Sequence, residues 1–150
     1  LIEENTHYSL YRANVLIIGY GRIGAALHNI LKGYGANITV CSRSRESEAQ
    51  AVFNGAKHIG FDELKAENHA DVIINTVPHM VLTKPELSAV KKDALILDLA
   101  SFPGGIDTLI ADSMGLLVLN GRRMPARYAE KTAGYLIGEA VSDIIEEEFN

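Results

Sequence analysis

The sequence contains one cysteine, no long apolar run and no excess of positive charge, and each shortage excludes a class of protein. Cys41 alone cannot form an internal disulfide or a cysteine-based metal cluster, and such a composition is typical of a reducing compartment. We therefore expect a cytoplasmic protein without a metal site. No apolar run approaches the roughly 20 residues of a membrane span, so no membrane insertion is expected. The net charge of −5 gives no general attraction for nucleic acid, and a bound phosphate must be held by local groups.

The remaining composition is that of an ordinary folded domain. Hydrophobic residues make up 47% of the 150 residues and charged residues 22%, which is typical of one globular unit. The chain opens at Leu1 without an initiator methionine, and residues 1–14 are polar. We expect residues 1–14 to be a lead-in segment from a preceding N-terminal domain and residues 15–150 to form one folded domain.

Apolar, β-branched runs alternate with segments of helical periodicity. Strands are expected at 15–18, 38–41, 57–60, 71–77, 94–99 and 116–119. Helical segments are expected at 23–31, 47–53, 64–69, 86–91 and 106–114, followed by a long amphipathic helix at 133–145. This alternation predicts an α/β protein with a three-layer Rossmann fold, whose doubly wound, mainly parallel sheet binds ligands beyond the carboxyl ends of its strands.

A glycine-rich turn follows the first expected strand. Gly19, Gly21 and Gly24 have the G-x-G-x-x-G spacing, in which the glycines allow a tight turn, close approach of a pyrophosphate, and contact between helix and sheet. Amide groups at the start of the next helix would bind the two phosphates of a dinucleotide, so residues 15–150 are predicted to form an NAD(P)-binding domain. The candidate cofactor-binding residues here are Gly19, Tyr20, Gly21, Arg22, Ile23 and Gly24.

The end of the second expected strand lacks the acidic residue that usually binds the ribose 2′-hydroxyl of NAD. Ser42, Arg43, Ser44 and Arg45 stand there instead. Two hydroxyls and two guanidinium groups can bind the 2′-phosphate of NADP, which an aspartate would repel. We therefore predict NADP in preference to NAD. The alternative is that Arg43 stacks on the adenine and Arg45 is solvated.

Polar residues also end two later strands, where they are expected to line the nicotinamide side of the site. These cofactor-binding candidates are Asn75, Thr76, Val77, Pro78, Asp98, Leu99, Ala100 and Ser101. For Asp98 and Ser101 the alternative is local hydrogen bonding that shapes the turn at 103–105. No catalytic acid or base is identified by spacing, and the candidates are His79, Asp98, Ser101 and Lys131.

A basic cluster follows the last expected strand. Arg122, Arg123, Arg127 and Lys131 stand close together in an otherwise acidic chain. They could hold a dicarboxylate, or they could be a solvated loop and the first turn of the last helix.

Three segments together resemble one known family, the A subunit (here called the A component) of bacterial dipicolinate synthase. The most specific is LILDLASFPGGID at 95–107, with INTVP at 74–78 upstream and KTAG at 131–134 downstream. The likeness covers nearly the whole chain from Tyr8 and corresponds to the family's C-terminal cofactor domain. More distantly, the chain is similar to the cofactor domain of D-2-hydroxyacid dehydrogenases.

The resemblance implies an NAD(P)-dependent oxidoreductase of sporulating bacteria that oxidises dihydrodipicolinate to dipicolinate. Loss of a hydride to the nicotinamide and of a proton makes the ring aromatic, so the protein mainly positions the ring. It also implies a small dicarboxylate substrate and a partner, the dipicolinate synthase B subunit, and we expect a homo-oligomer. Without an N-terminal domain and the partner, this chain is expected to bind cofactor without turnover.

One loop departs from the family, and two other functions remain open. The family has a Gly- and Pro-rich loop before 131–134, whereas residues 121–130 here read GRRMPARYAE, so a diverged relative could act on another compound. A nucleotide-sensing regulatory domain would use the same glycine turn, but commonly keeps an acidic residue where Ser42 or Arg43 stands. The cofactor half of a 2-hydroxyacid dehydrogenase usually has a catalytic histidine in its late loops, which contain none here.

Overall fold

The structure is a computed structural model that describes residues 9–67 and 69–121. It separates the chain into two compact units, Leu1–Asn120 and Gly121–Asn150, and the description below concerns the first. The basic cluster at 122–131, including Lys131, the expected helix at 133–145 and most of the expected lead-in segment lie outside the described residues.

The first unit is built on a parallel sheet of six strands in the order β3-β2-β1-β4-β5-β6. The strands are β1 (Asn14–Ile18), β2 (Asn37–Cys41), β3 (Lys57–Ile59), β4 (Val72–Asn75), β5 (Leu95–Asp98) and β6 (Leu117–Asn120). Every strand pair in the described residues is parallel. The strand order reverses between β1 and β4, and ligands of such sheets bind at this switch point. The expected α/β Rossmann fold is confirmed.

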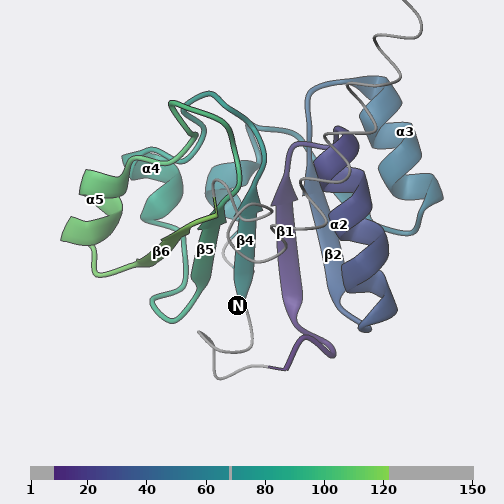
Figure 1. The fold of residues 1–150 in the computed structure, drawn as a ribbon, viewed down its shortest axis with the longest axis horizontal. Helices are drawn as coiled ribbons and strands as arrows, with labels where there is room; N and C mark the ends of the chain where they lie inside the picture. Colours follow the sequence, from purple (N-terminus) through teal and green to yellow (C-terminus); the bar gives the residue numbers. More distant parts are fainter. Residues whose placement is uncertain (1–8, 68, 122–150) are drawn as a thin grey trace, which may run out of the picture. The chain divides into compact units, whose positions relative to one another are not determined.

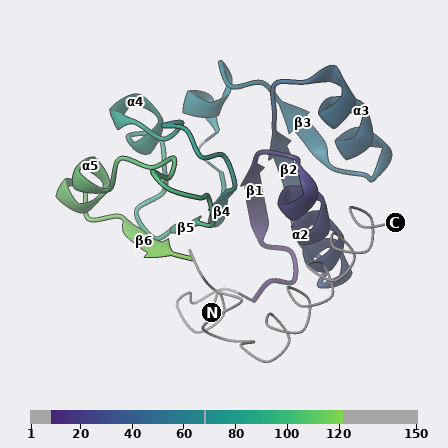
Figure 2. The same ribbon diagram turned by 45° about the horizontal axis from the view of Figure 1, so that its top comes forward.

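Helices cover both faces of the sheet (Figures 1 and 2). They are α2 (Arg22–Gly33), α3 (Arg45–Phe53), the 3₁₀ turn η1 (Leu64–Ala66), α4 (Lys84–Leu87) and α5 (Thr108–Ser113). Ser44 caps α3, its Oγ accepting a hydrogen bond of 3.1 Å from the Ser47 amide. Asp107 caps α5 in the same way, at 3.1 Å from the Ile110 amide. These caps begin each helix directly after a turn at the carboxyl edge of the sheet.

Alternate residues of the strands form two apolar clusters, one on each face. On β1, Val15 and Ile17 belong to the cluster beneath α2 and α3. Leu16 and Ile18 belong to the cluster beneath η1, α4 and α5. All four side chains are at most 1% exposed. Because both faces are covered, the central strands are continuous apolar runs, which is why they were recognisable in the sequence.

Several element boundaries predicted from the sequence were wrong. The helical segment expected at 64–69 is the 3₁₀ turn Leu64–Ala66, and the helix expected at 106–114 spans Thr108–Ser113. The strand expected at 71–77 ends at Asn75, because the Asn75 side chain donates to the Val77 carbonyl and accepts from the Val77 amide, both at 3.0 Å. The helix expected at 86–91 spans Lys84–Leu87, because Thr83 and Glu86 form a capping box that begins it earlier. The Thr83 hydroxyl and amide bind Glu86 Oε2 at 2.6 and 3.0 Å.

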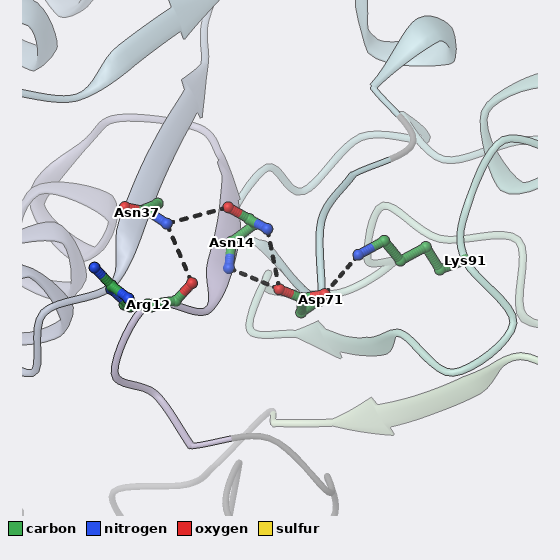
Figure 3. A network of polar contacts seen from close by, with 5 residues as sticks. All are labelled: Arg12, Asn14, Asn37, Asp71 and Lys91. Carbon is green, nitrogen blue, oxygen red and sulfur yellow. Dashed lines mark hydrogen bonds and ion pairs between the residues drawn. The ribbon is translucent and has the colours of Figure 1, made fainter.

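A polar network joins the strands at their amino ends, on the edge away from the glycine turn (Figure 3). Asp71 accepts hydrogen bonds from the Asn14 amide at 2.8 Å and from Lys91 Nζ at 2.6 Å. Asn37 Nδ2 continues the network to Asn14 Oδ1 at 3.3 Å. Burial alone would raise the pKa of Asp71, but the hydrogen bonds from Lys91 and Asn14 outweigh it and lower the pKa. The network therefore fixes β1, β2 and β4 beside one another.

Candidate functional site

The glycine turn adopts the geometry expected of a phosphate-binding turn. Gly19 follows β1 with a φ of +91°, a conformation that favours glycine, and its amide donates to the Cys41 carbonyl at 2.8 Å. A Cβ on Gly19 would overlap Thr76 Oγ1 and lie 2.8 Å from Val77 Cγ2. A Cβ on Gly24 would overlap the Gly19 carbonyl oxygen. The first and third glycines are therefore required by close packing between β1, α2 and the chain after β4.

Gly21 differs from the other two glycines because a Cβ there would meet no atom within 4 Å. It is the N-cap of α2, which has no side-chain cap and no acidic residue in its first turn. The first amides of a helix have no partner within the helix and attract anions. The backbone at Gly21 therefore faces open space beside these amides, as a bound pyrophosphate requires.

A cleft extends from this turn in two parts that share lining residues. The larger has a volume of about 540 Å³ and the smaller about 250 Å³. Both are lined by Gly19, Gly21, Arg43 and Val77. The larger part is also lined by Arg22, Ile23, Thr76, Pro78 and His79. The smaller part is also lined by Tyr20, Ser42, Ser44, Ser47 and Phe61. The cleft thus lies over β1, β2 and β4 at the topological switch point.

The four residues after β2 have different roles. Ser42 is 7% exposed, and its Oγ lies 2.9 Å from His58 Nε2. The Ser44 hydroxyl caps α3. Arg43 is exposed and lines both parts of the cleft, whereas Arg45 is exposed as the first residue of α3. Arg43 is therefore the guanidinium group of this segment that lies at the cleft.

The residues at and after the ends of β4 and β5 fall into two groups, those that line the cleft and a buried hydrogen-bonded pair, Asn75 and Asp98, which we call the clamp. Thr76, Val77, Pro78 and His79 line the cleft. Asn75 and Asp98 are 0% and 3% exposed, with Asn75 Nδ2 donating to Asp98 Oδ1 at 2.8 Å.

Asp98 also binds the loop that follows β5. It accepts hydrogen bonds from the Ala100 amide at 3.2 Å and from the Gly105 amide at 3.4 Å. A Cβ on Gly105 would lie 2.5 Å from Asn75 Nδ2, so this glycine allows the close approach. This arrangement matches the alternative in which Asp98 shapes the turn at 103–105. Leu99 is half-buried, Ala100 is buried and Ser101 is exposed.

Tyr20 lines the smaller part of the cleft, but its side chain is buried and its hydroxyl is bound within the protein. It is 6% exposed, and its hydroxyl lies 2.6 Å from His28 Nδ1 on α2. Asn54 Nδ2, after α3, donates to the same hydroxyl at 3.2 Å. Burial, and then the charge of Lys32, lower the pKa of His28. The Nδ1 atom of a neutral His28 can accept a hydrogen bond from the Tyr20 hydroxyl. This network therefore anchors the glycine turn to α2 and to the end of α3.

Two cleft residues were missed in the sequence, Ser47 and Phe61. Ser47 could have been found, because the first turn of a helix that begins after β2 lies at the same edge. Phe61 follows β3 and reaches the cleft beside the glycine turn only because β3 lies next to β2 in the sheet. Sequence periodicity does not reveal this order of strands.

Three further features of the described residues concern metal binding, the single cysteine and membrane-spanning helices. No group of three or more His, Cys, Asp or Glu side chains could hold a metal ion there. The Cys41 thiol is buried, and burial, with the charges of Glu63 and Asp62, raises its pKa to about 12. No helix in the described part of the chain is long and apolar enough to cross a membrane.

Comparisons with known proteins agree with this geometry. A profile of the family described as "D-isomer specific 2-hydroxyacid dehydrogenase, NAD binding domain" matches residues 2–101. The A component of dipicolinate synthase from Bacillus subtilis is 34% identical over 148 residues, 98% of this chain and 50% of that protein. A glyoxylate reductase of Thermococcus onnurineus is 32% identical over 99 residues, 62% of this chain and 28% of that enzyme.

Solved structures give the same result. The crystal structure of the dipicolinate synthase A component from Bacillus subtilis matches with a TM-score of 0.93 and 34% identity, over 97% of this chain and 49% of that chain. The crystal structure of the same component from Bacillus halodurans matches with a TM-score of 0.91 and 28% identity, over 95% of this chain and 50% of that chain.

The fold and the cleft define an NAD-binding Rossmann domain of the dehydrogenase type. The chain belongs to the family of NAD-binding domains of D-isomer specific 2-hydroxyacid dehydrogenases. Its similarity to the A component of dipicolinate synthase, expected from segments 74–78 and 95–107, is confirmed. The chain spans about half the length of the dipicolinate synthase components that it matches.

Proposed function

We propose that this chain is the cofactor-binding part of an oxidoreductase that converts dihydrodipicolinate to dipicolinate. The observation that carries the proposal is the extent of the likeness to the A component of dipicolinate synthase, which covers 98% of the chain. The glyoxylate reductase match covers 62%, and the family profile ends at residue 101. The segment after 101, which Asp98 fastens to the sheet through Gly105, therefore lies beyond the family profile but within the dipicolinate synthase likeness.

The residues at the cleft fit a dinucleotide. Gly21 leaves room for the pyrophosphate, and the first amides of α2 supply donors without a competing acidic side chain. Arg43 supplies a positive charge at the adenosine end, while Thr76, Pro78 and His79 line the other part of the cleft. When bound, the nicotinamide would accept a hydride from the substrate ring, which also loses a proton and becomes aromatic.

The protein's own contribution would be to hold the cofactor and the ring in contact. Among the catalytic candidates, His79 lines the cleft, Asp98 is buried in the clamp, and Ser101 is exposed. His79 is therefore the described candidate best placed to meet a substrate. A dicarboxylate substrate would also need cations, for which the cluster at 122–131 is the candidate.

We propose NADP as the preferred cofactor. Support comes from Arg43, which lines both parts of the cleft directly after the buried Ser42, and from a β2 end that carries no carboxylate. An arginine can bind a phosphate with two hydrogen bonds, whereas it gains less from a hydroxyl.

The cofactor proposal is tested by titrating the purified protein with NADPH and NADH and following nicotinamide fluorescence. Arg43→Ala should weaken NADPH binding about tenfold or more, as expected for the loss of a charge-assisted contact, and change NADH binding less. Arg45→Ala is the matched control and should leave both affinities unchanged. Tighter binding of NADH by the unaltered protein would contradict the NADP preference.

The reaction is tested with the full-length gene product that contains this chain, to which the B subunit of dipicolinate synthase is added. Reduction of the cofactor by dihydrodipicolinate is the expected result. No reduction by a folded, cofactor-loaded assembly would contradict the reaction and leave cofactor binding intact. Partnership with the B subunit, a homo-oligomeric state, a cytoplasmic location and a role in sporulation belong to the same proposal.

A further inference from the structure

We infer that Phe102 is a substrate-binding residue, whose aromatic ring packs against the face of the substrate ring at the edge of the cleft. It thereby selects a planar aromatic dicarboxylate over a saturated one. The inference rests on the proposed function, in which the protein must hold a ring against the nicotinamide.

Phe102 stands at the tip of a tight turn after β5. The Gly104 amide donates to the Ser101 carbonyl at 2.8 Å, which closes the turn around Phe102. Phe102 is 87% exposed, and Met80, in the loop after β4, is 57% exposed. Large apolar side chains that are exposed on neighbouring loops are typical of a binding surface.

The two loops that carry these side chains contain no charged residue. Residues 76–83 read TVPHMVLT and residues 99–106 read LASFPGGI, so neither segment contains Asp, Glu, Lys or Arg. Charged residues make up 22% of the chain as a whole. A carboxylate in these loops would repel a dianionic substrate, and neither loop has one.

The turn is fastened to the wall of the cleft through its backbone. The Gly105 carbonyl accepts a hydrogen bond from the Leu82 amide at 2.9 Å, so the loops after β4 and β5 run side by side (Figure 1). A Cβ on Gly105 would lie 2.7 Å from the His79 carbonyl oxygen. His79 lines the larger part of the cleft. Phe102 is therefore three residues from a glycine that packs against the cleft wall.

The order of the strands places Phe102 at the nicotinamide end rather than the adenosine end. The smaller part of the cleft is lined by Ser42 and Phe61, which follow β2 and β3. Phe102 follows β5, which is separated from β2 by β1 and β4. The adenosine is proposed to lie over β2, so the ring that Phe102 can meet is that of the substrate.

An exposed aromatic side chain on a fastened turn suits a planar ring. Contacts between aromatic rings are more favourable than the burial of apolar area alone. The carboxylates of dipicolinate lie in the plane of its ring, so a contact with the face leaves them to cations at the edge. The substrate ring becomes planar as the hydride leaves, and the contact with Phe102 therefore improves along the reaction.

The test uses the full-length gene product that contains this chain, together with the B subunit, saturated with oxidised NADP. Dipicolinate and oxidised NADP cannot react with each other, so calorimetric titration measures binding alone. Phe102→Leu should weaken dipicolinate binding about threefold to tenfold, as expected for the loss of one contact between aromatic rings. It should leave the affinity for the corresponding saturated piperidine dicarboxylate unchanged.

Two further variants make the result specific. Phe102→Tyr keeps the aromatic ring and should bind dipicolinate as the unaltered protein does. Phe53→Leu changes a phenylalanine that is 91% exposed at the end of α3, and should also leave dipicolinate binding unchanged. NADPH affinity, measured by fluorescence, should be the same in Phe102→Leu and in the unaltered protein.

Each outcome decides the inference. Equal dipicolinate affinity in Phe102→Leu and in the unaltered assembly would overturn it, and so would an equal loss of affinity for the aromatic and the saturated acid. Weaker binding of NADPH or of the B subunit, with dipicolinate binding unchanged, would assign Phe102 to another contact and overturn it as well.

The proposed function fails separately. If the unaltered assembly oxidises dihydrodipicolinate, the proposed function stands whatever Phe102→Leu does. If the unaltered assembly neither oxidises dihydrodipicolinate nor binds dipicolinate, the proposed function and the inference are both overturned. If circular dichroism shows that Phe102→Leu does not fold, Phe102→Met takes its place, and unaltered dipicolinate affinity in that variant overturns the inference.

Discussion

Replacing Gly21 with alanine separates the stability of the glycine turn from its capacity to bind a cofactor. Gly21 has a φ of −84°, which alanine adopts readily, and its added Cβ would meet no protein atom within 4 Å. Alanine is a poorer N-cap than glycine, so the expected loss of stability is no more than about 1 kcal/mol. The fold should therefore survive the change.

Cofactor binding should respond much more strongly. The new methyl group would occupy the space beside the first amides of α2, where the pyrophosphate is expected. Loss of one or two hydrogen bonds to a charged group, each about 1.5–3 kcal/mol, corresponds to a reduction in affinity of about tenfold to a thousandfold or more. Fluorescence titration with NADPH measures the affinity, and urea unfolding measures the stability of the same preparation.

Two other glycines of α2 provide matched controls. Gly33→Ala, at the far end of the helix, also meets no atom within 4 Å and should stabilise the protein by about 0.5–1 kcal/mol without affecting NADPH. Gly24→Ala would press against the Gly19 carbonyl and should cost about 1–3 kcal/mol of stability. If Gly21→Ala binds NADPH as tightly as Gly33→Ala does, the pyrophosphate does not lie at this turn.

Three other predictions concern stability and reactivity. Lys91→Met removes a partner of Asp71, whose folded pKa is lowered, and should lower the free energy of unfolding by about 1–2 kcal/mol above pH 4. The difference between variant and unaltered protein should shrink as the pH falls through the folded pKa of Asp71. Urea unfolding at pH 7 and pH 3 measures it, and an equal difference at both pH values would contradict the prediction. The pKa of His28 is lowered in the folded protein, so its contribution to stability should be fully present above about pH 6.5 and decline at lower pH, where the unfolded chain takes up a proton. His28→Leu should flatten this decline in thermal unfolding measured against pH. An unchanged slope would argue against a buried neutral imidazole. Cys41, with a pKa of about 12, should react with a disulfide reagent at pH 8 only after unfolding, and rapid reaction of the folded protein would show that the thiol is accessible.

The sheet and the glycine turn were predictable because short-range patterns determine them. A strand buried on both faces is a continuous apolar run, as Val15 to Ile18 show, and the glycines that follow satisfy local requirements of space and φ. Boundaries set by side-chain capping were less accessible. Asn75 ends β4 through its own bonds to Val77, although Pro78 is the more obvious stop in the sequence.

The direction of individual side chains could not be predicted. Tyr20 stands between two glycines of the turn and was a cofactor-binding candidate, yet its ring packs inward because His28 and Asn54 offer its hydroxyl partners. These partners lie 8 and 34 residues away along the chain. Such pairings depend on how α2 and α3 lie on the sheet, and no local pattern encodes them.

The buried pair of Asn75 and Asp98 has a consequence for how relatives of this protein can diverge. Its polar atoms bind the backbone of the loops after β4 and β5 and each other, so the paths of those loops depend little on their exposed side chains, although position 105 must remain glycine. Residues 76–79 project from this joint toward the cleft. Substitutions at 76–79 can therefore change ligand recognition without unfolding the protein. Substitution of Asn75 or Asp98 would remove hydrogen bonds that hold both loops.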